Sequence, residues 1–150
     1  MLLRVVAPAL LVAAACRREP APPPPGKLVL VAAPADGEVA PWVAAQVAAL
    51  PDRQVLVYVG AAWCEPCRYF HDAAAAGQLD RVFPRLTVLE FDADRDDARL
   101  GAAGYGAQMI PLFARPGVDG RAAGPRSEGS IKGPGAVEDL TERLFTVLAR

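Results

Sequence analysis

The chain has few of the residues that hold metals, since its 150 residues include only three cysteines and one histidine. A structural zinc site needs four ligands, and Cys64 and Cys67 have only Cys16 and His71 to join them. A c-type haem attachment requires a histidine directly after the second cysteine, where this chain has Arg68. The sequence therefore predicts no metal and no haem, and leaves Cys64 and Cys67 as a pair of thiols or a disulfide.

Neither sign of charge dominates the sequence. Sixteen basic and seventeen acidic residues give a net charge of −1, and they are scattered along the chain. Neutralising the phosphates of a nucleic acid takes a basic patch or stripe, which this sequence does not offer. Nucleic acid is therefore not an expected partner.

Long apolar runs are also scarce, and the longest is at the start of the chain. Residues 1–15 read MLLRVVAPALLVAAA, with a positive charge at Arg4, an apolar stretch interrupted by Pro8, and small residues at the end. A membrane-spanning helix needs about 20 apolar residues, more than this run supplies. The pattern predicts a secretory signal peptide over residues 1–15.

Cys16 follows these small residues directly. A small-small-Cys ending resembles the lipobox of bacterial lipoproteins, in which the leader is cut before the cysteine and the thiol then carries a lipid. The likeness is incomplete because Ala13 stands where a leucine is usual. We favour lipid attachment at Cys16. Two alternatives stay open: ordinary cleavage, which would leave a free Cys16, and a leader that stays uncleaved as an anchor. Each places the chain outside the cytoplasm, where disulfides persist.

Residues 16–26 carry five of the fifteen prolines, and consecutive prolines remove amide donors and fix an extended backbone. We interpret this segment as a linker of at most about 30 Å, at 3.1 Å per residue in polyproline geometry. Apolar runs and helical periodicities alternate after it, over residues 27–150. The pattern predicts an α/β domain with a central mixed sheet and helices on both faces. The expected strands are 28–31, 54–60, 86–91, 110–115 and 127–132, and the expected helices are 38–50, 67–82, 94–103 and 137–148.

Two cysteines separated by two residues stand where the second predicted strand runs into a helix. Unpaired amides and the helix dipole stabilise a thiolate at a helix N-terminus, so Cys64 is the predicted nucleophile. Cys67 lies one turn inward and is predicted to resolve the mixed disulfide that Cys64 forms. A purely structural disulfide is the alternative, although so small a ring gains little loop-closure entropy. The pair favours thiol–disulfide exchange.

The sequence VLVYVGAAWCEPCRYF, residues 55–70, resembles the active-site region of thioredoxin-like proteins. The segments LTVLEFDAD and YGAQMIPLF resemble the next strand of this family and its Ile-Pro segment, and a glycine-rich hairpin and a final helix follow in the family's order. The resemblance covers residues 27–150. It implies the thioredoxin fold, in which a central mixed β-sheet is flanked by helices on both faces.

The resemblance also implies roles for residues around the cysteines. Pro111 would follow a cis peptide bond, and the backbone of Ile110 would pair with an extended stretch of substrate. Trp63 would lie beside the cysteines and shape the docking surface, and Pro66 would stiffen the turn between them.

The sequence departs from the family at three positions. Tyr58 stands where thioredoxins usually carry a buried aspartate that relays protons to the second thiol, and Asp72 replaces a proline of the helix. Glu90 stands where such proteins often have a lysine. If the two strands are neighbours, Glu90 would lie near Tyr58 beneath the cysteines and could act as a substitute proton acceptor. A solvated strand glutamate is the alternative.

Two further residues could tune the thiols. His71 lies four residues after Cys67, on the cysteine side of the helix, where it could influence the thiolate; a partly exposed histidine without a role is the alternative. Glu65, between the cysteines, adds negative charge that opposes thiolate formation and favours a reducing potential, whereas Arg68 acts in the opposite sense.

The sequence thus predicts an exported thiol–disulfide oxidoreductase on the periplasmic side of the bacterial envelope, with no cofactor beyond a Cys64–Cys67 disulfide. Its CEPC motif resembles that of membrane-tethered reductants that serve cytochrome c maturation, which favours the reduction of protein disulfides. The expected partners are protein substrates, a membrane or envelope electron donor, and the membrane through a lipid on Cys16. Two alternatives stay open. The protein could be a disulfide-forming oxidant, or a redox-silent binding module that uses a cleft around Trp63, Ile110 and Pro111. No dimerisation segment is present, so a monomer is expected rather than an isomerase.

Overall fold

The computed structural model describes residues 26–149. The predicted signal peptide, Cys16 and the predicted linker as far as residue 25 lie outside the described residues. None of the helices within residues 26–149 combines the length and the hydrophobicity that a bilayer crossing requires.

A five-stranded mixed sheet forms the centre of the fold, with the strand order β1-β3-β2-β4-β5. Strands β1, β3 and β2 run parallel, whereas β4 is antiparallel to β2 and β5 is antiparallel to β4. The sequence predicts a mixed sheet, and the structure confirms it. The strands are β1 (Val29–Ala32), β2 (Gln54–Gly60), β3 (Leu86–Asp92), β4 (Leu112–Pro116) and β5 (Ala122–Glu128).

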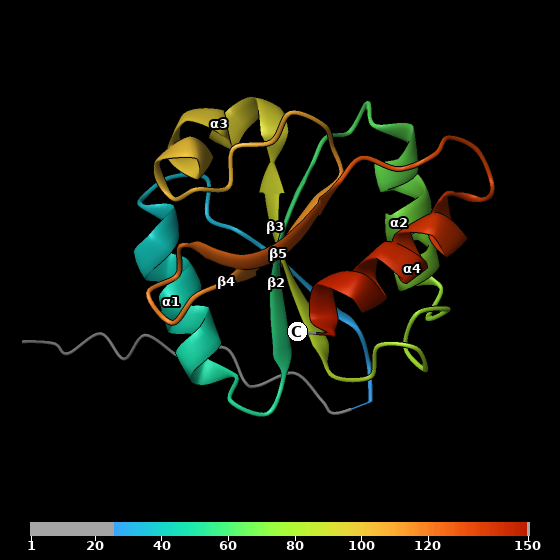
Figure 1. Ribbon diagram of the computed structural model, residues 1–150, viewed down its shortest axis with the longest axis horizontal. Helices are drawn as coiled ribbons and strands as arrows, with labels where there is room; N and C mark the ends of the chain where they lie inside the picture. The colour runs from blue at the N-terminus through green and yellow to red at the C-terminus, as the bar shows by residue number, and fades with distance from the viewer. Residues whose placement is uncertain (1–25, 150) are drawn as a thin grey trace, which may run out of the picture.

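Four helices cover the two faces of this sheet, as predicted. Figure 1 shows the sheet nearly edge-on, with α1 and α3 on one side and α2 and α4 on the other. The order along the chain is β1-α1-β2-α2-β3-α3-β4-β5-α4. The helices are α1 (Val39–Ala49), α2 (Glu65–Ala75), α3 (Ala93–Ala102) and α4 (Ala136–Leu148).

The central strand β2 is apolar after its first residue, Gln54, because both faces of the strand are buried from Leu56 onward. Leu56 and Tyr58 join the core beneath α2 and α4, whereas Val57 and Val59 join the core beneath α1 and α3. Side chains alternate between the faces of a strand, so a strand covered on both sides gains from a continuous apolar run. This packing fixes the position of the loop that leaves β2 at Gly60 and leads through Cys64 into α2, where Cys67 lies.

Helix α2 is shorter than predicted. The sequence predicts a helix over residues 67–82, but α2 begins at Glu65 and ends at Ala75. Gly77 has a φ of +71° and its N–H bonds to the Ala74 carbonyl, while the N–H of Gln78 bonds to the Ala73 carbonyl. This is the Schellman arrangement, which ends a helix at a glycine in the left-handed conformation. The alanine-rich composition favoured a longer helix, and Gly77 outweighs it.

Strand β5 begins five residues earlier than predicted. The sequence predicts a strand over residues 127–132, but β5 occupies Ala122–Glu128, directly after the turn at Gly120. Gly124 and Pro125 made this segment a poor strand candidate. The structure tolerates them because β5 is an edge strand, where a proline need not remove a ladder hydrogen bond. The remaining elements agree with their predicted bounds within two residues.

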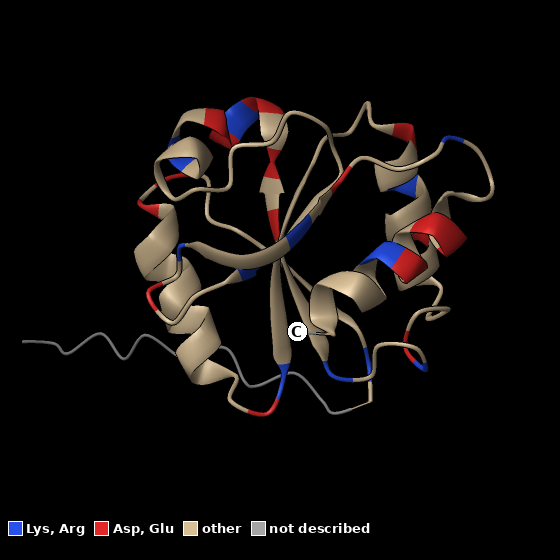
Figure 2. Cartoon of the chain, in the orientation of Figure 1, with Lys and Arg blue, Asp and Glu red and all other residues tan. Residues whose placement is uncertain are grey.

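Acidic and basic residues are interspersed on α2, α3 and α4, whereas α1 carries none. Figure 2 shows both signs of charge along α3 and along α4. On the face in view, neither helix carries charge of a single sign.

Candidate active site

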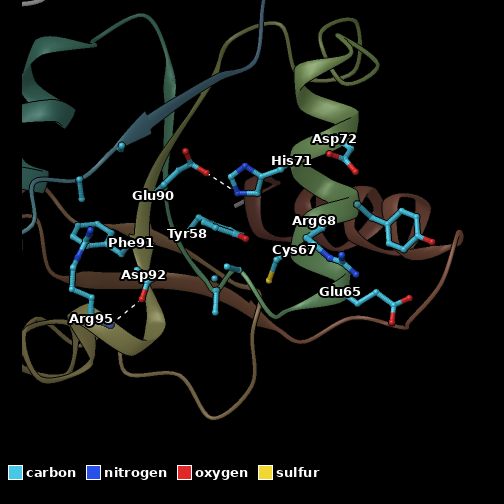
Figure 3. Close-up of a pocket in the computed structure, with 16 residues that line it drawn as sticks. Tyr58, Glu65, Cys67, Arg68, His71, Asp72, Glu90, Phe91, Asp92 and Arg95 are labelled. Atoms are coloured by element: carbon cyan, nitrogen blue, oxygen red, sulfur yellow. Dashed lines mark hydrogen bonds and ion pairs between the residues drawn. The ribbon is translucent and has the colours of Figure 1, made fainter.

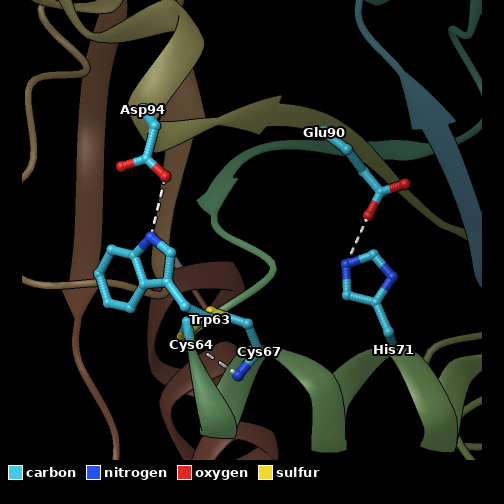
Figure 4. Close-up of a disulfide and its surroundings, with 6 residues drawn as sticks. All are labelled: Trp63, Cys64, Cys67, His71, Glu90 and Asp94. Atoms are coloured by element: carbon cyan, nitrogen blue, oxygen red, sulfur yellow. Dashed lines mark hydrogen bonds and ion pairs between the residues drawn. A yellow bond between two sulfur atoms is a disulfide. The ribbon is translucent and has the colours of Figure 1, made fainter.

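The two cysteines lie at the start of α2, just beyond the carboxyl end of β2. Cys64 is the N-cap residue of the helix and forms a disulfide with Cys67, with a distance of 5.2 Å between their Cα atoms (Figure 4). The backbone N–H of Cys67 donates a hydrogen bond to the Cys64 sulfur, at 3.3 Å. Pro66 occupies the first turn, where the missing N–H breaks no helical hydrogen bond. The geometry therefore offers the Cys64 sulfur a fixed amide donor and the positive end of a helix dipole.

Both cysteines have little contact with solvent. Cys64 is 4% exposed and Cys67 is 2% exposed. Trp63, by contrast, is 68% exposed, and its indole N–H donates a hydrogen bond of 2.8 Å to Asp94 in α3 (Figure 4). Trp63 thus lies on the surface beside the disulfide, where the sequence places it.

The Ile-Pro segment has the backbone geometry that the resemblance implied. The peptide bond between Ile110 and Pro111 is cis. Ile110 packs against the core cluster that contains both cysteines, and Met109 before it is 60% exposed. The pairing of the Ile110 backbone with a substrate stays a prediction.

A pocket of about 690 Å³ lies beneath the disulfide, between α2 and the end of β3. Figure 3 shows Cys67 at one side of this pocket, with Tyr58, His71 and Glu90 pointing into the same region. Tyr58 and Glu90 are direct neighbours in the pairing of β2 with β3. The predicted juxtaposition of Glu90 with Tyr58 is therefore confirmed.

Glu90 and His71 form an ion pair across this pocket. His71 Nε2 lies 2.9 Å from Glu90 Oε1, and no donor among residues 26–149 reaches that buried oxygen at a favourable hydrogen-bond angle. The contact with Glu90 raises the pKa of His71 above 6.5, although burial acts in the opposite direction. Burial, together with the charge of Glu90, raises the pKa of Tyr58, so its phenol stays protonated. The His71 imidazole, a group that can exchange a proton near neutral pH, thus lies in the pocket that Cys67 also lines.

Solved structures of thioredoxins resemble the described chain. The thioredoxin of Trichomonas vaginalis is 19% identical with a TM-score of 0.51, and the alignment covers 77% of this chain and 96% of the other. The short form of thioredoxin f from spinach chloroplast is also 19% identical with a TM-score of 0.51, with coverages of 83% and 94%. The Fasciola hepatica thioredoxin is 19% identical with a TM-score of 0.50, and the alignment covers 81% of this chain and 98% of the other.

The chain has the thioredoxin fold. No family model matches the sequence, and no curated protein matches it. The strand order and the likeness to the solved thioredoxin structures confirm the fold class that the cysteine motif and the Ile-Pro segment predict.

Within this thioredoxin fold, the structure assigns Glu65 a contact that the sequence did not reveal. Its carboxylate accepts a hydrogen bond of 3.0 Å from the backbone N–H of Gly133, in the loop between β5 and α4. The two residues are 68 positions apart, and no local pattern connects them. Asp94, the partner of Trp63, was also missed, although it follows β3 at the same edge of the sheet as Cys64, where carboxyl ends of parallel strands meet.

Among residues 26–149, no three side chains of the histidine, cysteine, aspartate or glutamate type gather closely enough to hold a metal ion. The electrostatics of the thioredoxin-fold site come from the helix terminus, the His71–Glu90 pair and the charged residues that line the pocket. These lining residues are Glu65, Arg68, Asp72, Asp92 and Arg95.

Proposed function

We propose that the protein is a thiol–disulfide oxidoreductase that reduces protein disulfides, with Cys64 as nucleophile and Cys67 as resolving thiol. The observation that carries the proposal is the Cys64–Cys67 disulfide at the N-cap of α2, where the Cys67 amide donates to the Cys64 sulfur. After reduction, the same amide and the helix dipole favour a thiolate at Cys64 over one at Cys67. The thioredoxin fold supports the proposal because it places such a pair at the edge of a rigid sheet.

The reaction proceeds by two exchanges of sulfur bonds. The Cys64 thiolate attacks one sulfur of a substrate disulfide, and a substrate thiolate leaves as the mixed disulfide forms. The Cys67 thiolate then attacks the Cys64 sulfur, which forms the Cys64–Cys67 disulfide and releases the second substrate thiolate. Two electrons pass to the substrate, and the thiol proton of Cys67 must be accepted by a base.

Glu90 and His71 are proposed to take part in that proton transfer. Support comes from their position in the pocket that Cys67 also lines and from their ion pair of 2.9 Å. Tyr58 occupies the place of the family's aspartate and stays a neutral phenol, so it does not supply the base. Water in the pocket would connect Cys67 with the pair.

The place of action is proposed to be the bacterial envelope, with the protein tethered by a lipid on Cys16. The support is the sequence pattern of residues 1–25, which lie outside the described residues. A dithiol donor in the envelope or membrane would regenerate the reduced pair, and apocytochromes c are one class of substrate that the CEPC motif suggests. Mass spectrometry of the protein from its native membrane tests the tether, because a diacylglycerol on Cys16 adds a defined mass.

The low exposure of the cysteines favours a second candidate, a redox-silent module that binds peptides beside Trp63 and Pro111. An insulin-reduction assay with dithiothreitol as electron donor separates the two functions. If the protein is a reductase, the full chain accelerates insulin precipitation, and Cys64→Ser abolishes the acceleration. The reductase would be excluded, leaving only the binding module, if two results were found together. Insulin would precipitate equally fast with wild type and with Cys64→Ser, and the Cys64–Cys67 disulfide of the folded protein would resist reduction by dithiothreitol.

A further inference from the structure

The loop that connects β5 to α4, residues 129–135, lies against the segments that border the disulfide. The N–H of Gly129 donates a hydrogen bond of 2.9 Å to the carbonyl of Pro111. A Cβ at Gly129 would lie 3.5 Å from the Cβ of Met109, so the two segments are in contact. We call residues 129–135 the β5–α4 loop.

Glu65 ties the other end of the β5–α4 loop to the active-site helix. Glu65 is the first residue of α2, and its carboxylate accepts the N–H of Gly133 at 3.0 Å. A hydrogen bond to a carboxylate is stronger than one between neutral groups. Glu65 thus occupies the position next to Cys64 and holds a segment far along the sequence.

Helix α4 provides a second tie at the middle of the β5–α4 loop. Asp139 accepts hydrogen bonds from the Ser130 hydroxyl at 2.9 Å and from the Ile131 N–H at 3.4 Å. Arg143 pairs with the same carboxylate at 2.7 Å. The β5–α4 loop is therefore held at Gly129, at Ser130 and at Gly133, and only the last contact comes from the helix that carries the cysteines.

Three exposed apolar side chains stand on the three segments that border the disulfide. Trp63 precedes Cys64 and is 68% exposed, Met109 precedes Ile110 and is 60% exposed, and Ile131 on the β5–α4 loop is 51% exposed. We call these three residues the apolar rim. Large exposed apolar side chains on segments next to a reactive group are candidates for contact with a partner.

We infer that Glu65 is a positioning residue for protein substrates, because its carboxylate holds the β5–α4 loop, and with it Ile131, in place beside the disulfide. This inference rests on the proposed function. The occupant of the apolar rim is an extended segment of a substrate protein with apolar side chains on either side of its disulfide-bonded cysteine. A small disulfide without flanking residues would not need the rim.

Two substitutions at the same position separate the hydrogen bond from the charge. Glu65→Ala and Glu65→Gln both remove the negative charge beside Cys64, so any effect of that charge on the thiolate is common to both variants. Only Glu65→Gln keeps an oxygen that can accept the Gly133 N–H. We expect the KM for insulin to be at least about threefold higher in Glu65→Ala than in Glu65→Gln, with equal rates for hydroxyethyl disulfide in the two variants.

Hydrogen exchange of the Gly133 amide in the full chain gives a readout that does not depend on activity. We expect its exchange to be at least about tenfold faster in Glu65→Ala than in wild type, and close to wild type in Glu65→Gln. Ser130→Ala removes one of the two hydrogen bonds that tie the β5–α4 loop to Asp139 and should also raise the KM for insulin, without changing the rate with hydroxyethyl disulfide.

Each failure has a distinct signature. Equal KM values for insulin in Glu65→Ala and Glu65→Gln would overturn the positioning role, and unchanged Gly133 exchange in Glu65→Ala would show that the contact does not hold the loop. A wild-type protein that reduces neither insulin nor hydroxyethyl disulfide would instead overturn the proposed function, and the positioning role with it.

Discussion

The two cysteines differ in their surroundings although the disulfide joins them. Cys64 has the larger exposed fraction, 4% against 2%, and its sulfur accepts an amide hydrogen bond at the helix N-terminus. After reduction we therefore expect Cys64 to react with iodoacetamide faster than Cys67, by about tenfold or more if their thiol pKa values differ by one or more. Short alkylation pulses followed by peptide mass spectrometry measure both rates, and Cys16→Ser serves as the control for the third thiol. A faster Cys67 would reverse the roles assigned here.

His71 offers a direct probe of the pocket because it is the only histidine of the chain. Its contact with Glu90 raises its pKa above the ordinary value of 6.5. We expect Glu90→Gln to lower the pKa of His71 and to move the inflection of the rate–pH profile to lower pH. Proton NMR follows the single imidazole titration in wild type and variant. If the His71 titration moves while the rate–pH profile does not, Glu90 has no part in the mechanism.

At the scale of single residues, short-range patterns predicted what lies along one strand or one helix. Glu90 was found because residues at equivalent places on neighbouring strands face each other, and His71 because four residues make about one helical turn. The partner of Glu65 could not be found in this way. Its contact with Gly133 depends on how the β5–α4 loop folds back over α2, which the tertiary structure sets.

At the scale of elements, periodicity predicted where strands and helices lie, and it failed where one residue decides a boundary. The α2 helix ends at Gly77 against the preference of its alanines, and β5 includes Gly124 and Pro125 because it lies at the edge of the sheet. The predicted bounds are most accurate for β2 and β3, since burial of most residues on both faces leaves a largely apolar run in each strand.

Two glycines in different elements should respond oppositely to the same substitution. Gly120, in the turn between β4 and β5, has a φ of +76°, and a Cβ there would lie 1.9 Å from the carbonyl oxygen of Ala40 in α1. Gly101 lies in α3, and a Cβ there would meet nothing within 4 Å. We expect Gly120→Ala to destabilise the fold by about 2–4 kcal/mol and Gly101→Ala to stabilise it by about 0.5–1 kcal/mol. Urea unfolding followed by circular dichroism measures both, and a Gly120→Ala protein as stable as wild type would contradict the close packing of this turn on α1.

At the scale of the whole molecule, the dependence of stability on pH follows from a few ion pairs. Hydrogen bonds lower the pKa of Asp139, and the bond from Arg143 has the largest effect. Burial alone would raise the pKa of Glu128, but the hydrogen bonds that this carboxylate accepts outweigh burial and lower its pKa. Carboxylates with a lowered pKa contribute stability above their ordinary pKa values and lose it in acid. The His71–Glu90 pair acts oppositely, because a raised histidine pKa contributes stability below pH 6.5 that is lost as the pH rises through the raised value. The two trends together predict greatest stability between about pH 4 and pH 6.5.

Asp96 should make the largest single contribution to this acid sensitivity. Its side chain is fully buried in α3 and accepts hydrogen bonds from Arg95 and Arg99 at 2.8 Å and from the Asp92 N–H at 2.9 Å. Burial alone would raise the pKa of Asp96, but these donors outweigh it and hold the pKa at about 2. The difference between this pKa and the ordinary value of 3.8 corresponds to about 2 kcal/mol of stability. That contribution is fully present above pH 3.8 and is lost as the pH falls through 2.

The substitution Asp96→Asn tests this contribution, with Asp97→Asn on the exposed side of the same helix as the matched control. We expect Asp96→Asn to lower the free energy of unfolding at pH 6 by about 2 kcal/mol, and we expect its difference from wild type to shrink as the pH falls toward 2. Asp97→Asn should leave the free energy of unfolding nearly unchanged at each pH, because its side chain is exposed and pairs with no buried group within residues 26–149. Urea unfolding at pH 6 and pH 2.5 measures the differences. A gap between wild type and Asp96→Asn of the same size at both pH values would mean that packing, rather than the charge of Asp96, holds α3 against the end of β3.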